Sequence, residues 1–136
     1  MRPIFRQFQL KNIQAPNFLM TPLELKDYID FEVKRVYFIT NPRGTAGGHC
    51  HRQEKELFVM LNGSCLVEID WGEGIKEIKM EGLKTALYIS RYVWHFFKEF
   101  SPDAVLMALS STNYDPERKD YIEDYKKYQE VIKTFK

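Results

Sequence analysis

The three histidines of the chain lie in two short segments, and their spacing suggests one site. His49 and His51 are separated by a single residue, and His95 follows roughly forty residues later. Alternate side chains of a strand share a face, so His49 and His51 should project together while Cys50 points the other way. Histidine has an ordinary pKa of about 6.5, which suits proton transfer near neutral pH, and neutral imidazole also binds metals. The pattern therefore indicates acid–base chemistry or a metal site.

A carboxylate and a glycine extend this pattern. Four residues separate His51 from Glu56, and six more separate Glu56 from Gly63. Imidazole suits Fe, Mn, Ni and Zn, and a carboxylate favours the harder ions. If a metal is bound, we expect its ligands to be His49, His51, Glu56 and His95. An ordinary buried polar cluster remains the alternative, because structural networks use the same residue types.

The segments that carry these residues are predicted to be strands. Short runs of strand character separated by turn residues predict an all-β sandwich or barrel. The expected strands cover residues 5–10, 33–39, 47–51, 56–70, 74–80, 85–90, 93–100 and 103–110. Asn62 and Gly63 divide the fourth run and favour a type I′ hairpin, whose two central residues need positive φ. The stretch from Asp70 to Gly74 predicts a second reversal.

The pattern changes after Tyr114. Asp115 and Pro116 form a good N-cap and first-turn pair for a helix. Four side chains then recur at helical spacing, which predicts a core-facing stripe: Tyr121, Tyr125, Tyr128 and Ile132. We expect one domain over residues 1–136, with a β-barrel over 1–112 and a C-terminal helical segment over 113–136.

Composition excludes several functions. The 20 Lys and Arg against 19 Asp and Glu give a net charge of +1, which offers no broad field for nucleic acid or an anionic membrane. No run approaches the ~20 apolar residues of a membrane helix. The opening segment does not resemble a signal peptide, so we expect a cytoplasmic protein. Cys50 and Cys65 are then expected to be free thiols.

Two levels of resemblance follow from these residues. The string His-x-His-x4-Glu-x6-Gly resembles the first motif of the cupin superfamily, and His95 stands where the second motif keeps its histidine. Several segments together are similar to those of the nucleotide-sugar 3,4-ketoisomerases. These segments are residues 33–37, 60–65, 87–90, 93–95, 113–115 and 120–122.

The resemblance implies a fold and an activity. The fold would be an RmlC-like cupin, a double-stranded β-helix barrel that forms a homodimer. The reaction would convert dTDP-4-keto-6-deoxyglucose to a 3-keto sugar through an enediol, without metal or other cofactor, in the synthesis of a deoxysugar for a polysaccharide. The nucleotide, the glycan pathway and the product configuration at C4 are not implied.

The resemblance also assigns roles to residues. The resemblance implies that His49, His51 and Tyr37 are catalytic. From the chemistry of these side chains, we expect His51 to remove the proton from carbon, His49 to move a proton between the two oxygens, and Tyr37 to donate to the enediolate. Arg35 shares the strand face of Tyr37 and could also reach the interior. The expected substrate-binding residues are Arg35, Arg43, Arg91, Tyr92, Trp94 and His95, with Arg52 as a further candidate for the pyrophosphate.

Departures from the family pattern keep other functions open. Thr45 to Gly48 replace a segment that usually contains arginine, and Glu56 stands where the family often has glutamine. Glu56 restores a full set of metal ligands, so a metal-dependent dioxygenase or isomerase is one alternative. A dTDP-sugar 3,5-epimerase and a non-catalytic sugar-binding cupin are the others.

Overall fold

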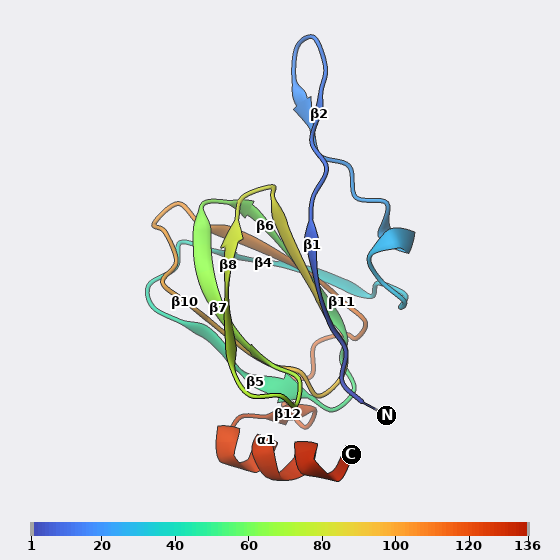
Figure 1. Ribbon diagram of the computed structural model, residues 1–136, viewed down its shortest axis with the longest axis vertical. Coiled ribbons are helices and arrows are strands. Elements are labelled where there is room, and N and C mark those ends of the chain that lie inside the picture. Colours follow the sequence, from blue (N-terminus) through green and yellow to red (C-terminus); the bar gives the residue numbers. More distant parts are fainter. Residues whose placement is uncertain (1, 136) are drawn as a thin grey trace.

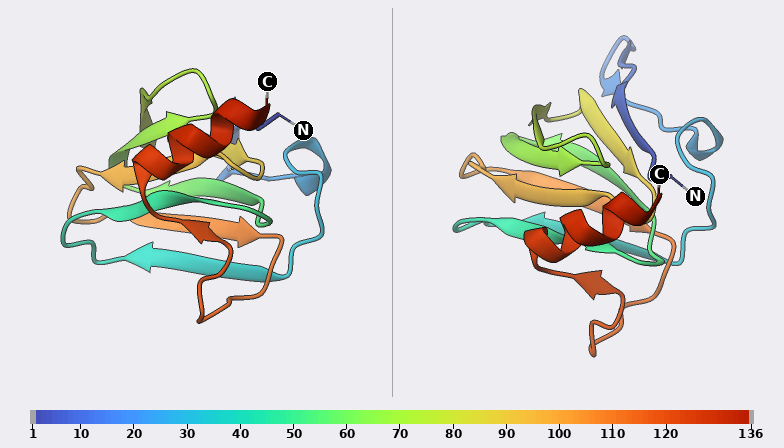
Figure 2. Two further views of the ribbon diagram at one scale, coloured as in Figure 1. Left: turned by 90° about the horizontal axis from the view of Figure 1, so that it is seen from below. Right: turned by 60° about the horizontal axis from the view of Figure 1, so that its bottom comes forward.

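The computed structural model describes residues 2–135 and confirms the all-β barrel (Figure 1; Figure 2). Two five-stranded antiparallel sheets face each other. The first sheet has the order β1 (Phe5–Gln9), β9 (Thr85–Ile89), β6 (Glu56–Asn62), β11 (Val105–Ser110) and β4 (Arg35–Thr40). The second has the order β12 (Tyr121–Ile122), β5 (Ala46–His51), β10 (Trp94–Lys98), β7 (Ser64–Asp70) and β8 (Lys76–Glu81).

Alternation along the strands divides the apolar side chains between two clusters. In β6, Phe58 and Met60 belong to the core between the sheets, whereas Leu57 and Val59 belong to a cluster outside the first sheet. The second cluster is covered by the segment over residues 23–33, which includes the 3₁₀ helix η1 (Leu25–Asp27). Both faces of β6 are therefore buried, which explains its continuous apolar run.

The turn at Asn62 and Gly63 differs from the predicted hairpin. β6 and β7 lie in different sheets, so this turn is a corner at which the chain passes from one sheet to the other. Only Gly63 has positive φ, at 73°. A Cβ on Gly63 would lie 2.2 Å from Ser101 Oγ and 2.9 Å from Ala104 Cα, so a larger residue would collide with the chain. The predicted reversal after Asp70 is confirmed, because β7 and β8 pair as an antiparallel hairpin.

The C-terminal helix begins later than predicted. Helix α1 (Tyr125–Ile132) starts after Asp124, whose carboxylate accepts a hydrogen bond from the Lys126 N–H at 3.0 Å, and η2 (Lys133–Phe135) follows it. Asp115 instead accepts from the Glu117 N–H at 2.9 Å and closes a turn. The chain is then extended through β12, which pairs with β5, so the first half of segment 113–136 is not helical.

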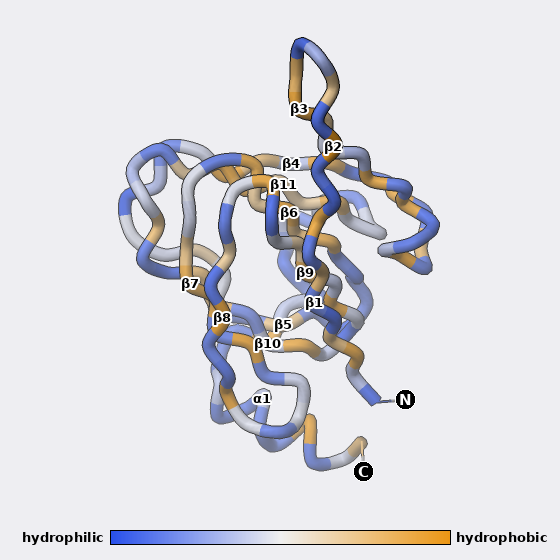
Figure 3. Tube along the Cα trace, turned by 45° about the horizontal axis from the view of Figure 1, so that its top comes forward, coloured by the Kyte–Doolittle hydropathy of each residue, from blue (hydrophilic) through white to orange (hydrophobic). Residues whose placement is uncertain are grey.

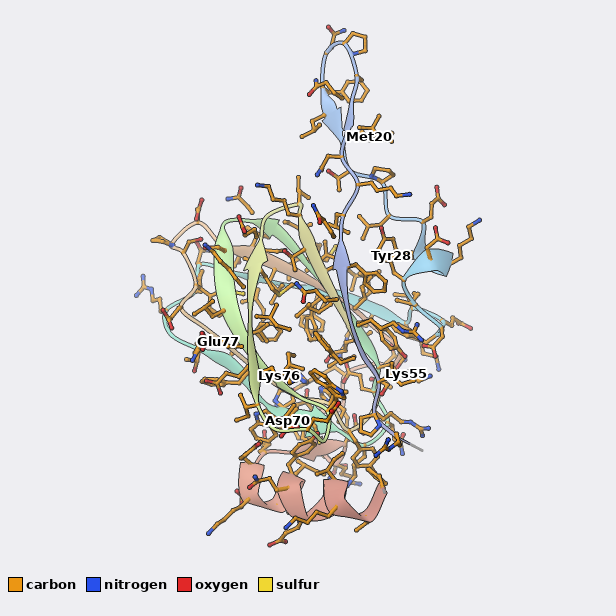
Figure 4. The ribbon with its side chains drawn as sticks, viewed as in Figure 1. Met20, Tyr28, Lys55, Asp70, Lys76 and Glu77 are labelled. Carbon is orange, nitrogen blue, oxygen red and sulfur yellow. The ribbon has the colours of Figure 1, made fainter. Side chains whose placement is uncertain are left out.

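Helix α1 packs across one end of the barrel, as Figure 2 shows. Tyr128 is fully buried, and its single hydroxyl hydrogen is shared between the carbonyl oxygens of Asp70 at 2.8 Å and Tyr92 at 2.9 Å. Tyr125 donates to the Asp70 carboxylate at 2.7 Å, and Figure 4 shows Asp70 beside the helix. The predicted packing of the tyrosine stripe on the barrel is confirmed for these two tyrosines.

A small hairpin projects from the barrel at the other end (Figure 1; Figure 4). Its strands are β2 (Ile13–Gln14) and β3 (Leu19–Met20), which the sequence did not predict. Figure 3 shows apolar residues along both strands. Four large apolar side chains of this hairpin are exposed: Ile13, Phe18, Leu19 and Met20. Within residues 2–135, no helix has the length and apolar character needed to span a membrane.

Candidate active site

A bulge between β5 and β10 shapes the strand that carries the histidine pair. His95 pairs with His49, but the next residue of β10 pairs with Gly47, so Gly48 is an extra residue in β5. Gly47 and Gly48 have positive φ angles of 81° and 83°. A Cβ on Gly47 would lie 2.9 Å from the His95 carbonyl oxygen. The two glycines therefore allow the local bend that directs His49.

The three histidines meet at a cavity of about 430 Å³. The ring centroid of His49 lies 4.7 Å from the ring centroid of His51 and 4.7 Å from that of His95. The ring centroids of His51 and His95 are 5.5 Å apart. Cys50 points away and is buried beside α1, as strand alternation predicted. The cavity is lined by Arg35, Tyr37, Ile39, Gly47, His49, His51, Phe58, His95, Phe97, Tyr114, Arg118 and Tyr121.

Carboxylates surround the imidazole of His51. Its Nδ1 lies 3.1 Å from Asp120 Oδ2 and 3.4 Å from Glu54 Oε1, and its Nε2 lies 3.3 Å from Glu56 Oε1. Burial alone would lower the pKa of His51, but the interactions with Asp120 and Glu56 outweigh it and raise the pKa to about 9. His51 is consequently an imidazolium at neutral pH in the free site.

His49 and His95 have the opposite character. Burial, together with the neighbouring His95 and His51, lowers the pKa of His49 to about 2. Burial also lowers the pKa of His95 to about 4. The His95 Nδ1–H donates to the Val93 carbonyl at 3.0 Å, which leaves the lone pair on Nε2. None of the three imidazoles keeps the ordinary pKa from which the sequence argument started.

Glu56 lies between Tyr37 and His51. The Tyr37 hydroxyl donates to Glu56 Oε2 at 2.5 Å. Burial and the charge of Glu56 raise the pKa of Tyr37 far above its usual range, so the phenol keeps its proton. Burial would raise the pKa of Glu56, but the adjacent His51 lowers it to about 2. A charged Glu56 thus lies between a phenol donor and an imidazolium.

Glu54 links the histidine to an arginine. Its Oε2 accepts from Arg35 Nη2 at 2.8 Å and from Ser110 Oγ at 2.5 Å, while its Oε1 faces His51. Arg35 pairs with Ser110 across β4 and β11, and Glu56 pairs with Ser110 across β6. The ladder of the first sheet therefore brings Arg35 and Glu56 to either side of Ser110, and Glu54, two residues before β6, reaches the same place.

The donor set also fits a divalent cation. The histidines offer one nitrogen each within 4.8 Å of one another. Glu56 Oε1 is buried and has no hydrogen bond of its own, although it lies 3.3 Å from His51 Nε2 and 3.7 Å from His95 Nε2. Such an ion would have to displace the proton of His51, since only the unprotonated ring offers a lone pair.

Trp94 and Tyr92, which were expected to bind substrate, do not line the cavity. His95 faces inward, so Trp94, its neighbour in β10, faces outward, where it packs on Tyr125 with ring centroids 5.2 Å apart. Tyr92 packs on Phe135 at 4.7 Å. Both rings hold α1 and the C-terminal turn on the barrel.

Three of the four expected arginines do not line the cavity. Arg43 is exposed in the loop between β4 and β5. The charge of Arg91 favours a lower pKa of the Tyr88 phenol, and Tyr88 belongs to the cluster outside the first sheet. Arg52 donates to the Tyr121 carbonyl at 3.0 Å and so holds β12 in place. Arg35 is the single arginine of the expected set that lines the cavity.

The sequence argument missed several cavity residues, and three of them come from one segment. The chain between β11 and β12 crosses from the first sheet to the second and places Tyr114, Arg118 and Tyr121 in the cavity lining. Asp120 lies beneath them against His51. The similarity of segment 120–122 to the ketoisomerases was a usable signal, but helical spacing assigned Tyr121 to the core.

The chain is similar to known 3,4-ketoisomerases. A curated TDP-4-oxo-6-deoxy-alpha-D-glucose-3,4-oxoisomerase of Aneurinibacillus thermoaerophilus is 37% identical over 115 residues, which cover 83% of this chain and 81% of that protein. The 3,4-ketoisomerase QdtA of Thermoanaerobacterium thermosaccharolyticum, solved as a histidine-to-asparagine mutant with TDP-4-keto-6-deoxyglucose, is 31% identical. Its TM-score is 0.83, with 96% of this chain and 94% of that chain covered.

A more distant likeness concerns the fold alone. The rmlC epimerase of Mycobacterium tuberculosis is 16% identical, with a TM-score of 0.72 over 84% of this chain and 66% of that chain. The barrel is therefore of the RmlC-like cupin type that the sequence predicted. The family model FdtA, described as WxcM-like, C-terminal, matches residues 5–133, and the chain belongs to this family.

Proposed function

We propose that this protein is a sugar-nucleotide 3,4-ketoisomerase acting on TDP-4-keto-6-deoxyglucose. The observation that carries the proposal is the meeting of His49, His51 and Tyr37 at one cavity, in a chain of this family. The relatives' names supply the substrate and the reaction. The cytoplasmic location expected from the sequence remains part of the proposal.

The reaction needs three proton movements. The proton on C3 leaves, a proton arrives at C4, and the hydroxyl proton of O3 moves to O4 as the enediol forms and collapses. A positioned general base contributes roughly 10² to 10⁴ in rate. The chain must therefore supply a base for carbon and a carrier between the two oxygens.

The environments of His51 and His49 support different roles. The carboxylates make His51 the stronger base of the two, which suits a weakly acidic carbon proton once the imidazolium has lost its own proton. His49 stays neutral, so it offers one N–H and one lone pair. A neutral imidazole of this kind can accept from O3 and donate to O4 in turn. These roles are the ones expected from the sequence.

Tyr37 is suited to stabilise the enediolate. Its hydroxyl keeps its hydrogen and donates it in a hydrogen bond to Glu56 in the free site. In the complex we expect this hydrogen to turn toward the developing oxyanion, because a preorganised donor is worth most where charge appears.

An isotope experiment tests the reaction directly. The protein is incubated with TDP-4-keto-6-deoxyglucose in D₂O, and the sugar is followed by NMR. We expect a 3-keto sugar that carries deuterium at C4. Exchange at C5 as well would indicate the 3,5-epimerase, and binding without any exchange would indicate the non-catalytic alternative.

A metal-dependent cupin enzyme is the second candidate, favoured by the buried Glu56 Oε1 that lies beside the Nε2 atoms of both His51 and His95. A bound cation would be held by His49, His51, His95 and Glu56. It would supply Lewis-acid polarisation of a substrate oxygen.

A homodimer also belongs to the proposal. The family resemblance implies it, and two exposed apolar surfaces support it. One is the projecting hairpin with Phe18 and Leu19, and the other is the outer side of β4, an edge strand, with Val36 and Phe38. Edge strands and apolar patches of this kind are commonly covered by a partner.

A further inference from the structure

Two glutamates connect His51 to strand β4 through different nitrogens of its ring. Glu56 Oε1 lies 3.3 Å from His51 Nε2, and the other oxygen of Glu56 accepts a hydrogen bond from the Tyr37 hydroxyl. Glu54 Oε1 lies 3.4 Å from His51 Nδ1, and the other oxygen of Glu54 accepts from Arg35 Nη2 at 2.8 Å. Each carboxylate therefore links the histidine to β4, the strand that carries Tyr37 and Arg35.

The link through Glu56 has to open during the reaction. The hydrogen of Tyr37 must leave Glu56 to reach the enediolate. Asp120 lies 3.1 Å from His51 Nδ1, so Nε2 is the nitrogen that is left to face the reacting carbon. The link through Glu54 lies on the Nδ1 side of the ring, and it can keep its contacts while the substrate reacts.

Glu54 is itself held firmly. Its side chain is only 4% exposed, and its Oε2 also accepts from Ser110 Oγ at 2.5 Å. Ser110 is fully buried in β11, where it pairs with Arg35 across the sheet. A buried carboxylate with a guanidinium and a hydroxyl as donors is restricted in geometry, since charge-assisted hydrogen bonds are strong and directional. Glu54 thus fastens the loop 52–55, between β5 and β6, to the first sheet.

Arg35 carries the constraint from Glu54 to Tyr37. The Arg35 Cζ lies 5.1 Å from the centroid of the Tyr37 ring, and the two side chains share one face of β4. A guanidinium at this distance from an aromatic ring is attracted to its face. Displacement of Arg35 would therefore also release the ring of Tyr37.

We propose that Glu54 is a positioning residue that fixes the carbon base His51 relative to the proton donor Tyr37. This rests on the proposed function and assigns a role to a buried side chain that does not line the cavity. Glu54 acts through its two neighbours, with one carboxylate oxygen facing His51 and the other holding Arg35. Its loss should misplace the two catalytic groups, and a misplacement of about 1 Å can cost roughly 10²-fold in rate.

Replacements of Glu54 separate its placement from its charge. Glu54→Leu removes both contacts, and kcat should fall by roughly ten- to hundredfold while KM stays within about threefold. Glu54→Gln is neutral but keeps an oxygen that accepts from Arg35 and Ser110, so it should recover part of kcat. A Glu54→Gln variant as slow as Glu54→Leu would reject the positioning role, because the charge would then be what matters.

Ser110→Ala is a milder variant, needed because Glu54→Leu leaves Arg35 unpaired and could prevent folding. It removes one hydrogen bond to Glu54 and keeps the ion pair with Arg35, so kcat should fall by roughly two- to tenfold. The matched control is Ser111→Ala. Ser111 Oγ accepts from the Lys55 N–H at 2.8 Å, so this variant loosens the same loop without touching the contacts of Glu54. Wild-type kcat in Ser110→Ala, or an equal loss in Ser111→Ala, would overturn the proposal.

A spectrum of the substrate-free protein tests the position of His51 without any reaction. The three histidines of the chain all line the cavity, so labelling histidine with ¹⁵N reports on this site alone. In long-range ¹H–¹⁵N spectra, the His51 ring signals, assigned with His51→Asn, should shift and broaden in Glu54→Leu and stay unchanged in Ser111→Ala. Unchanged His51 signals in Glu54→Leu would overturn the proposal. If these signals respond to Glu54 but the wild type does not isomerise the sugar, the proposed function fails alone and the placement of His51 by Glu54 stands.

Discussion

Asp120 Oδ2 lies 3.1 Å from His51 Nδ1, although 69 residues separate them in the sequence. Asp120 is itself fixed, because its carboxylate accepts from the N–H groups of Gln53 at 2.6 Å and Glu54 at 3.2 Å. These bonds tie β12 to the residues that follow β5. Asp120 is therefore held in position by backbone donors, and it fixes the ring orientation of His51.

Replacement of Asp120 should change the pH dependence of the reaction. His51 must be unprotonated to take a proton from carbon, and its pKa is raised to about 9. In the wild type, kcat/KM should therefore rise about tenfold per pH unit toward pH 9 and then level off. Asp120→Asn removes the interaction that raises the pKa, so the midpoint should move to lower pH while the plateau falls by roughly 10² to 10⁴.

Asp120→Glu is the companion variant, since it keeps the carboxylate and should recover part of the plateau. Asp124→Asn, at the N-cap of α1, controls for general disturbance of the C-terminal segment. A lower plateau in Asp120→Asn with the wild-type midpoint would mean that Asp120 supports the fold and does not set the pKa of His51.

The two neighbouring histidines should respond differently to asparagine. His51→Asn should abolish isomerisation and leave the affinity for the nucleotide sugar within about tenfold, or ~1.4 kcal/mol, because the imidazole acts mainly in the transition state. His49→Asn should keep hydrogen exchange at C3 measurable in D₂O but slow formation of the 3-keto sugar. Full activity of His51→Asn would reject the assigned roles. If only His49→Asn loses hydrogen exchange at C3, then His49 is the carbon base and His51 is the carrier between the oxygens.

Much of this site could be predicted from sequence because the signals are local. The one-residue spacing of His49 and His51 fixes their common face in any strand, and the same alternation places Arg35 with Tyr37. Reversal after Asp70 also depends on a few adjacent residues. Such local patterns do not depend on how the rest of the chain folds.

The missing parts depend on contacts between distant segments. Trp94 faces away from the cavity because His95 faces it, which alternation could have indicated. The orientation of Asp120 and Arg118, however, depends on β12 pairing with β5, and helical spacing in the same stretch hid that strand. Gly63 shows the same limit, since its dipeptide fits a hairpin but the two strands that it joins pair with other partners.

Glu56→Gln separates the isomerase from the metal-dependent alternative. In a metal-free site, glutamine can still accept the hydrogen of Tyr37 and can donate to a histidine Nε2, so activity should stay within roughly tenfold. The loss of a negative charge should also lower the pKa of His51. Metal content is measured on protein purified without chelators, together with the rate. Loss of about one metal per chain in parallel with activity would favour the metal-dependent enzyme.

The last prediction concerns association of two copies of the chain. Removal of residues 1–10 would take away β1, which packs Phe5 on Trp71 and buries Leu10, so it would disturb the barrel itself. The double variant Phe18→Ser, Leu19→Ser alters only the projecting hairpin, where both side chains are more than half exposed. If the hairpin contacts a second copy, this variant should be monomeric by light scattering at micromolar concentration, with the thermal unfolding of the barrel retained.

The control is Ile75→Ser, which replaces an exposed apolar residue in the turn between β7 and β8. This variant should remain dimeric. Light scattering from the wild type that shows only a 16.2 kDa species would reject the dimer. If the double variant remains dimeric, the interface lies elsewhere, and the outer side of β4 is the next surface to test.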